Sequence, residues 1–177
     1  MIEDLDKYIL IEELSRKRGG KIGRTALMKF MFFLQTIRNM PLGYRFTLYS
    51  YGPFDSDVLS DLGEAELLEY VESDIMEYPG GYGYEIRPTD PPSKSDILSQ
   101  YDGDINWVIE EFGELNSAEL ELASTAVFAD REEPSSSQSL EDLVNRVRQV
   151  KPHFTKETIR ARVEDLLNKD LLSSIKG

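Results

Sequence analysis

The stretch from Gly43 to Tyr70, GYRFTLYSYGPFDSDVLSDLGEAELLEY, constrains the fold more than any other part of the chain. Alternating side chains predict a strand over Tyr44–Tyr51, and the pair Gly52-Pro53 terminates it. The pattern that follows is typical of a helix with one buried face. Its apolar positions are Val58, Leu62, Ala65 and Leu68.

Helices are expected on both sides of this strand. The segment Arg24–Asn39 is apolar almost all the way round, which predicts a central core helix. Glu3–Arg18 carries the apolar face of an earlier helix. After the strand, Asp55 or Ser56 can cap the next helix, and we expect Gly63 to divide that helix into two short ones.

The residues after Tyr70 have the spacing of a β-hairpin. Val71–Tyr78 and Tyr82–Pro88 are its predicted strands, and Pro79-Gly80-Gly81 supplies the tight turn. Helix, strand, helix and hairpin in this order predict a winged-helix-like body, with the hairpin as its wing. The expected fold class is therefore mainly α with a small antiparallel β-sheet (α+β), plus additional C-terminal helices.

Residues 91–177 are predicted to form a helical part that packs on a winged-helix-like core of residues 1–90. The Ser-rich segment 130–139 is expected to be a flexible loop. We expect the two parts to form one compact domain. The predicted elements of the second part are a short helix at 96–101, a helix capped by Asp104, a helix over Ser117–Ala129 and two last helices capped by Ser139 and Thr155.

Composition narrows the class of protein. A hydrophobic content of 40% supports a core and argues against disorder throughout. The chain contains no Cys, which removes disulfides, thiolate nucleophiles and Cys-ligated zinc together. No run reaches the ~18–20 apolar residues of a membrane span, and the acidic N-terminus does not resemble a signal peptide. We therefore expect a cytoplasmic protein that makes no membrane contact.

The net charge of −13 is concentrated in the middle of the chain. Residues 54–133 carry 22 acidic side chains against 3 basic ones, a net charge of −19, whereas residues 1–38 carry 8 basic and 5 acidic ones, a net charge of +3. An acidic segment of this kind repels phosphate backbones and attracts basic partners. Solubility alone is the other explanation of the same charge.

The basic residues near the end of the first predicted helix allow two interpretations. Cations at a helix C-terminus complement the helix dipole, and the same cluster could instead contact phosphate. These candidate phosphate contacts are Arg16, Lys17, Arg18, Lys21 and Arg24.

No motif points clearly to catalysis. The only histidine, His153, lies in a turn between two predicted helices, where a partly packed side chain is the simpler interpretation. Asp102-Gly103-Asp104 lacks the ligand spacing of a calcium loop, and the Gly80–Gly83 segment lacks the lysine of a phosphate loop. We expect no enzyme, no cofactor and no metal. An acidic metal site assembled from distant residues is the weakest alternative.

The helix predicted after Pro53 would be the recognition helix of a winged helix, and the hairpin would be its wing. Both carry mainly acidic side chains, which DNA phosphates repel. A winged helix that reads DNA presents basic residues on these elements, yet Arg87 is the only basic residue on the predicted hairpin. We therefore expect this surface to bind a basic protein, and a DNA-binding transcriptional regulator is the alternative. The candidate partner surface comprises Asp61, Glu64, Glu66, Glu69, Glu72, Asp74, Glu77 and Glu85.

Three blocks, TALMKFMFFLQ, GYRFTLYSYGPFDSDVLSDL and VRQVKPHFTKETI, together resemble the YwgA-like family of uncharacterised prokaryotic proteins. More distantly, the chain is similar to the Panacea domain of SocA-type antitoxins. The resemblance implies a winged-helix-like, mostly helical fold and a non-enzymatic role, with a toxin or another basic protein as partner. The positions that match the family signature are Tyr49, Tyr51, Gly52, Pro53, Phe54 and Asp57, and we expect their aromatic rings to pack against the helix at 24–39.

Overall fold

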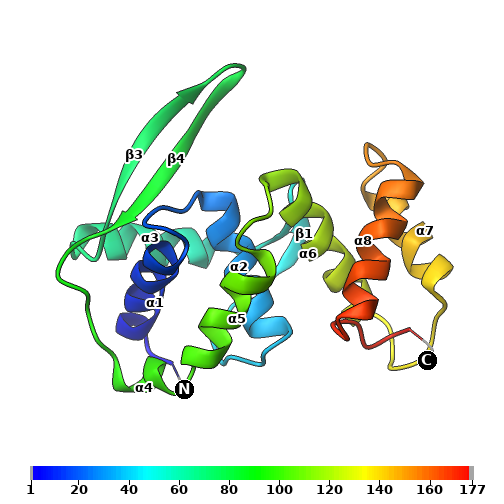
Figure 1. The fold of residues 1–177 in the computed structure, drawn as a ribbon, viewed down its shortest axis with the longest axis horizontal. Helices are drawn as coiled ribbons and strands as arrows, with labels where there is room; N and C mark the ends of the chain where they lie inside the picture. Colours follow the sequence, from blue (N-terminus) through cyan, green and yellow to red (C-terminus); the bar gives the residue numbers. More distant parts are fainter. Residues whose placement is uncertain (1, 176–177) are drawn as a thin grey trace. The chain divides into compact units, whose positions relative to one another are not determined.

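The computed structural model describes residues 2–175, which form eight helices and two small two-stranded sheets (Figure 1). The fold is mainly α with a small β content, as predicted. Contacts divide the chain into two compact units. The first combines Met1–Thr47 with Phe54–Ser117, and the second combines Leu48–Pro53 with Ala118–Gly177. The sequence had suggested a boundary near residue 90, whereas the first unit extends to Ser117.

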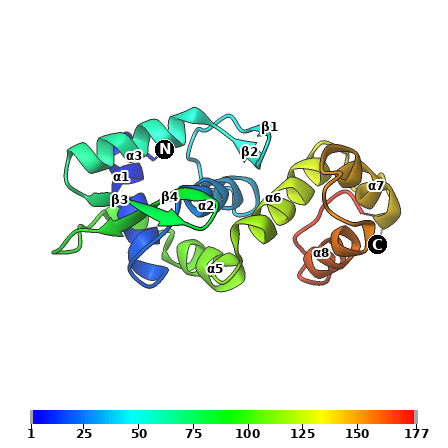
Figure 2. The ribbon, with the colours of Figure 1, turned by 90° about the horizontal axis from the view of Figure 1, so that it is seen from above.

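The core of the first unit is built around α2 (Arg24–Thr36), as the sequence predicted. Nine consecutive residues of this helix, Ala26–Leu34, are buried. Phe33 stacks on Phe112 of α5 (Asp102–Phe112) with ring centroids 3.9 Å apart. Figure 2 shows α2 among α1 (Asp4–Lys17), α3 (Ser56–Leu67) and α5. A helix that is apolar on every side needs neighbours on every side, and α5, α3 and the hairpin strand β4 (Gly81–Pro88) contribute them.

The wing is a regular antiparallel hairpin. Strand β3 (Val71–Tyr78) pairs with β4 (Gly81–Pro88) in continuous register over eight residue pairs. Ile22, between α1 and α2, pairs with Ile86 of β4 through backbone hydrogen bonds of 2.9 and 2.8 Å. This isolated bridge ties the hairpin to the segment between α1 and α2, and the first helices, α3 and the hairpin follow one another in the predicted order.

Two local predictions in the first unit are wrong. Gly63 does not divide α3, because Leu62 and Ala65 on either side are buried and the helix continues through it. Asp104 does not cap α5, since the helix already begins at Asp102 after Tyr101. The short helix α4 (Asp96–Ser99) lies close to its predicted position and is capped by the Ser95 hydroxyl.

The predicted strand Tyr44–Tyr51 is shorter than expected and contains only β1 (Thr47–Tyr49), which pairs with β2 (Gly52–Phe54). The amide side chain of Gln35 both accepts from Tyr44 N–H and donates to its carbonyl, each at 2.9 Å. Because the Gln35 side chain forms hydrogen bonds with both backbone groups of Tyr44, these groups are satisfied without pairing to another strand.

The second unit contains α6 (Ser117–Arg131), α7 (Leu140–Val150) and α8 (Lys156–Asn168), and α7 packs against α8 (Figure 2). The predicted caps are confirmed: Ser139 and Thr155 accept from the backbone N–H groups of their own first turns.

The segment predicted to be a flexible loop is held in place by the C-terminal end of the described chain. Backbone N–H groups of Ser136 and Gln138 donate to the carbonyls of Ser173 and Ser174 at 3.1 and 3.0 Å. The carboxylate of Asp130 is fully buried and accepts from Ser173 and Ser174. Burial alone would raise the pKa of Asp130, but these hydrogen bonds and the neighbouring Arg131 outweigh it and hold the pKa below its usual value.

In the described part of the chain, each helix is too short or too polar to cross a bilayer.

Candidate protein-binding surface

The hairpin is anchored at its base and uncovered along its outer half. At the base, Val71 and Ile86 are buried and the Ile22 bridge fixes β4. Further out, Ile75 and Tyr82 are 64% and 69% exposed. Exposed apolar groups on a structured hairpin are characteristic of surfaces that another molecule covers.

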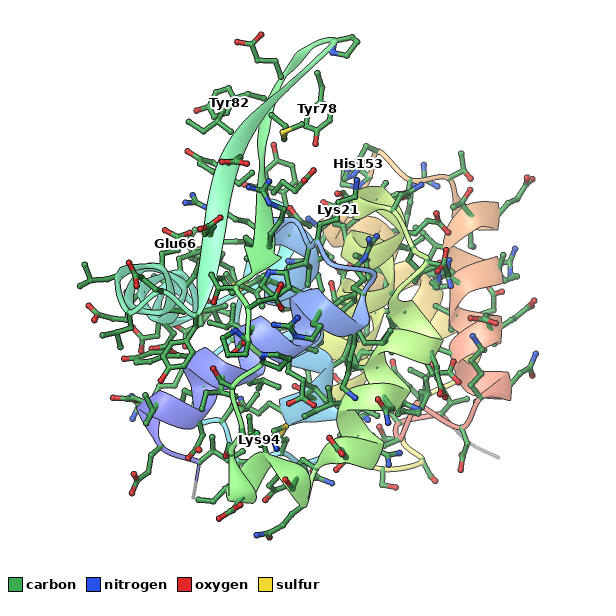
Figure 3. All side chains as sticks on the ribbon, turned by 60° about the vertical axis from the view of Figure 1, so that its left-hand side comes forward. Lys21, Glu66, Tyr78, Tyr82, Lys94 and His153 are labelled. Carbon is green, nitrogen blue, oxygen red and sulfur yellow. The ribbon has the colours of Figure 1, made fainter. Side chains whose placement is uncertain are left out.

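Apolar side chains lie on both faces of the outer hairpin. Cross-strand partners share a face, so the register places Ile75 and Tyr82 on one face and Met76 and Tyr78 on the other. The Tyr78 ring extends across the hairpin, where a Cβ at Gly83 would lie 3.2 Å from its Cε2 atom. Figure 3 shows Tyr78 and Tyr82 on this outer half.

The end of α3 continues this apolar surface at the base of the hairpin. Leu67 is 74% exposed and Leu68 is 51% exposed. Thr89, which follows β4, donates its backbone N–H to the carbonyl of Tyr70 and its hydroxyl to the carbonyl of Glu69. The end of the helix and the base of the hairpin are therefore tied together.

Acidic side chains surround these apolar groups. Among residues 2–175, the carboxylates of Glu64, Glu69, Glu72 and Glu77 are exposed and make no hydrogen bond or ion pair with the protein. An unpaired carboxylate keeps its full attraction for a cation brought by a partner. We call these four glutamates and six apolar side chains the α3–hairpin surface; the apolar members are Leu67, Leu68, Ile75, Met76, Tyr78 and Tyr82.

The other four predicted partner residues are engaged within the fold. Asp74 and Glu85 both pair with Arg87, and Glu85 also lies 4.0 Å from Lys21. Glu66 accepts a hydrogen bond from Ser73. Glu66 and Glu85 link the hairpin to the rest of the first unit, and Asp74 links the two strands of the hairpin. All three are less available to a partner than the four unpaired glutamates.

Asp61, the last member of the predicted set, serves the core of the first unit. It accepts a 2.6 Å hydrogen bond from the hydroxyl of Tyr44, which is buried. Burial raises the pKa of Asp61 above its usual value, although Tyr44 and Lys7 both favour its charged form. Its position against α1 removes it from the partner surface.

An open cavity of about 590 Å³ lies where α3 meets the hairpin base. Val71 and Thr89 contribute to its wall, and four carboxylates surround it (Figure 3 labels Glu66). Lysine or arginine side chains of a partner are the groups that such a wall complements. The four acids are Glu66, Glu69, Glu72 and Asp90.

Helix α3 offers no cation to a phosphate, and most of the candidate phosphate contacts bind other groups of the protein. Helix α3 contains no Lys or Arg. Arg16 binds Glu12, Asp90 and the carbonyl of Thr89. Lys17 binds Asn106, Lys21 lies 4.0 Å from Glu85, and the Arg24 guanidinium lies 3.6 Å from the centroid of the Tyr84 ring. The Nε atoms of Arg18 and Arg24 are buried and have no hydrogen-bond partner among the described residues.

Two of the aromatic residues in the predicted signature lie at the surface. Tyr49 and Tyr51 are 63% and 74% exposed, so the prediction that they pack against α2 is wrong. Phe46 does pack against α2, with its ring centroid 5.3 Å from that of Phe32. Of the other signature residues, Pro53 is buried, Phe54 is half-buried, and Asp57 is exposed in the first turn of α3.

Gly52 stands where the backbone requires a glycine. Its φ is +98°, and a Cβ would lie 3.1 Å from Ser124 Oγ and 3.2 Å from Thr125 Oγ1 of α6. Both the positive φ and the close approach exclude a larger residue. The turn of β1–β2 therefore lies directly on α6 within the second unit.

A buried ion pair fixes the same turn. Lys151 is 3% exposed and donates to the carbonyls of Tyr49 and Ser50 and, at 3.0 Å, to Glu121 Oε1. His153 Nε2 lies 3.4 Å from the second oxygen of Glu121, and its side chain is exposed. The sequence analysis missed Lys151 and Glu121, because neither stands in a local pattern that points to the other.

Residues 2–175 contain no group of three or more His, Asp or Glu side chains placed to hold a metal ion. No family model matches the chain, and no curated protein matches it significantly.

Proposed function

We propose that this chain is a non-enzymatic protein-binding module of the cytoplasm, antitoxin- or adaptor-like, that docks a basic protein through the α3–hairpin surface. One observation carries the proposal: four unpaired glutamates are interspersed with six exposed apolar side chains on a firmly anchored wing. The resemblance to the YwgA-like family and the Panacea domain is compatible with this role and forms part of the proposal.

The two kinds of side chain would have different tasks. Exposed aromatic and aliphatic groups, such as Tyr82 and Ile75, supply the buried centre of an interface, where most binding energy arises. The glutamates around them favour a basic partner and speed its approach, since complementary charge acts mainly on specificity and association rate. Within residues 2–175 no third strand pairs with the outer half of the hairpin. Its edges can therefore accept an extended segment of the partner.

DNA binding is the second candidate, and the charge of the winged helix disfavours it. Non-specific affinity for duplex DNA comes largely from neutralised phosphates. Helix α3 has no basic residue, and Arg87 on the wing is already paired with Asp74 and Glu85. A duplex approaching these elements would meet unpaired carboxylates.

The proposal can be tested by photo-crosslinking in the native host. A photoreactive phenylalanine analogue replaces Tyr82 on the outer hairpin, and Gln149, exposed on α7, serves as the control position. We expect Tyr82 to give a discrete crosslink to a protein with a basic surface, and Gln149 to give none.

The captured protein is then purified and titrated against the wild-type chain and against the variant Glu64→Gln, Glu69→Gln, Glu72→Gln, Glu77→Gln. We expect the variant to bind more weakly and with a smaller salt dependence. Equal crosslinking at both positions, or an affinity that the four substitutions leave unchanged, would contradict the proposal.

A further inference from the structure

The two edges of the hairpin differ in what covers them. Ile22 and Ile86 of β4 exchange backbone hydrogen bonds in both directions, so the N–H and C=O groups of Ile86 point away from β3. A Cβ at Gly23 would lie 3.7 Å from the carbonyl oxygen of Tyr84, which places this oxygen on the same edge of β4. The segment between α1 and α2 therefore covers the β4 edge from its base as far as Tyr84.

The register then shows which backbone groups β3 presents on its own outer edge. Ser73 lies opposite Ile86, and pairs with and without mutual hydrogen bonds alternate along an antiparallel ladder. The N–H and C=O groups of Ser73, Ile75 and Glu77 therefore point away from β4. In the described part of the chain, no other backbone segment bonds to them.

The outer half of β3, Asp74–Tyr78, is exposed at every residue. Nearer the base, the Ser73 side chain is half-buried and its hydroxyl donates to Glu66 of α3. Figure 1 shows both strands of the hairpin extending beyond α3. An uncovered strand edge is a template on which another strand can pair. The outer half of β3 is therefore the place where a strand can be added.

The acidic side chains of β3 indicate the chemistry of such a strand. β3 carries Glu72, Asp74 and Glu77 and no Lys or Arg. Asp74 pairs with Arg87 across the hairpin, whereas Glu72 and Glu77 have no ion partner among residues 2–175. Residues directly opposite each other on neighbouring strands share a face, and opposite charges stabilise such a pair. A strand with basic residues at these positions is therefore favoured.

A second copy of this chain fits the same edge poorly. Pairing of two β3 strands would bring together strands that each carry three acids and no cation, and like charges on neighbouring strands destabilise a sheet. Each chain also carries a net charge of −13, so two copies repel one another. A basic partner has neither disadvantage.

We propose that the outer half of β3 pairs with an extended segment of a basic protein partner, which becomes the third strand of the wing. The segment carries Lys or Arg opposite Glu72 and Glu77 and apolar residues opposite Ile75 and Met76. Main-chain hydrogen bonds to Ile75 and Glu77 supply affinity, and the alternating side chains supply specificity. Strand addition rests on the proposed function, and it specifies the edge, the backbone contacts and the sequence pattern of the partner.

A synthetic peptide tests the pairing directly. Its sequence, Val-Lys-Val-Val-Lys-Thr-Arg with both ends blocked, is written to lie antiparallel to β3 and to face Tyr78 first and Glu72 last. The control peptide is N-methylated at the residues opposite Ile75 and Glu77, so it keeps every charge and side chain but cannot donate to the edge. We expect the first peptide to bind the full chain with a dissociation constant below about 1 mM at about 50 mM salt, and the control to bind at least about tenfold more weakly.

Hydrogen exchange measured by NMR locates the contact. With the peptide in excess, we expect exchange of the Ile75 and Glu77 amides to slow by at least about fivefold. The Met76 amide points towards β4 and should change little, as should the Tyr82 amide on the opposite edge. A contact made by charge alone would slow no alternating set of amides.

Proline variants test the same edge from the side of the protein. Ile75→Pro removes an N–H that points away from β4, a position where an edge strand tolerates proline, whereas Ile75→Ala shortens the side chain and keeps the N–H. We expect Ile75→Pro to bind the peptide at least about fivefold more weakly than Ile75→Ala does. Tyr82→Pro and Tyr82→Ala form the matched pair on the β4 edge and should bind alike. Slow exchange of the Met76 amide shows in each variant that the hairpin is intact; if Ile75→Pro loses it, the comparison of the two peptides decides.

Strand addition is contradicted if neither peptide binds below about 1 mM, if both bind equally, or if the Tyr82 amide is protected in place of the Ile75 amide. Concentration-dependent protection of Ile75 in the free chain would also overturn it and would place a second copy on the edge. A peptide affinity that falls in the quadruple glutamate-to-glutamine variant but is insensitive to N-methylation removes only the added strand and leaves the binding of a basic partner standing. Failure of the crosslinking experiment at Tyr82 removes the proposed function itself.

Discussion

Replacing Lys151 with methionine tests how the turn of β1–β2 is held. The Lys151 side chain is 4% exposed, and its ammonium group has three acceptors: the carbonyls of Tyr49 and Ser50 and a carboxylate oxygen of Glu121. The Glu121 side chain is 8% exposed. Methionine has nearly the same length and fills the space of the lysine chain, so the substitution removes the charge with little change in packing.

The expected loss follows from what the substitution leaves behind. Glu121 would remain buried beside the exposed His153 but without its closest cation. Removing one member of a buried ion pair typically costs about 3–5 kcal/mol, because the other charge stays desolvated. We therefore expect Lys151→Met to lower the free energy of unfolding of the second unit by about 3–5 kcal/mol.

The double variant Lys151→Met, Glu121→Met separates the charge from the hydrogen bonds. Replacing both members of a buried pair with apolar residues is often nearly neutral. The two carbonyls of the turn still lose their donor, which costs about 1 kcal/mol each. The double variant should therefore be more stable than the single variant by at least about 1 kcal/mol.

Urea unfolding followed by circular dichroism measures the free energy, and hydrogen exchange of α6 amides assigns the loss to the second unit. The only tryptophan, Trp107, lies in α5 of the first unit and would not report this change. A single variant that loses less than about 1 kcal/mol, or a double variant that is less stable than the single one, would refute the reasoning.

Four further outcomes follow from single residues. Phe33→Ala should cost about 3–5 kcal/mol in urea unfolding, because the ring is fully buried and stacked in the core; a loss below about 1 kcal/mol would contradict this core assignment. Gly52→Ala should cost about 1–3 kcal/mol, since φ is +98° and α6 leaves little room for a methyl group; an unchanged unfolding midpoint would count against this explanation. The depressed pKa of Asp130 stabilises the fold above the unfolded-state value of about 3.9, and this contribution is lost as the pH falls through the lower folded-state pKa. Asp130→Asn should therefore lower the melting temperature at pH 7 and flatten its fall in acid; parallel pH profiles would show that Asp130 is not responsible. Tyr82→Ser should change the free energy of unfolding by less than about 0.5 kcal/mol, because the side chain is exposed, and a larger loss would place it in the fold and not in a binding surface.

Local sequence patterns predicted the parts of the fold that short-range physics determines. The apolar run of α2 permits only a central helix. Alternating residues on either side of Pro79-Gly80-Gly81 determine the register of the wing. Ser139 and Thr155 cap their helices because their hydroxyls accept from N–H groups two or three residues away.

The features that the sequence did not reveal depend on residues far apart in the chain. Lys151 bonds to carbonyls about one hundred residues earlier, and no periodicity connects them. Gln35 replaces the strand partner of Tyr44, and Ser173 and Ser174 order the segment that composition predicted to be flexible. In each case, a side chain or a distant backbone group forms the hydrogen bond that a polar atom requires. A local sequence pattern predicts a different partner for that atom.

The sequence likewise predicted only part of the candidate surface. Its negative charge was predicted from composition, and the four unpaired glutamates retain it. Asp61 is bound by Tyr44, and Asp74 and Glu85 are bound by Arg87, so these three acids are less available to a partner. These tertiary contacts could not be predicted from local sequence patterns. The exposed leucines at the end of α3 were also missed, because a helical pattern alone predicts Leu68 on the buried face.

The central claim is that the sign of the charge prevents this winged helix from binding DNA, and one titration tests it most directly. A fluorescent duplex is titrated at about 50 mM salt with the wild-type chain and with the variant Glu64→Lys, Glu69→Lys, Glu72→Lys, Glu77→Lys. We expect no binding by the wild type, and binding by the variant that weakens steeply towards about 200 mM salt, as phosphate contacts require. Binding of the duplex by the wild-type chain with a comparable salt dependence would contradict the claim.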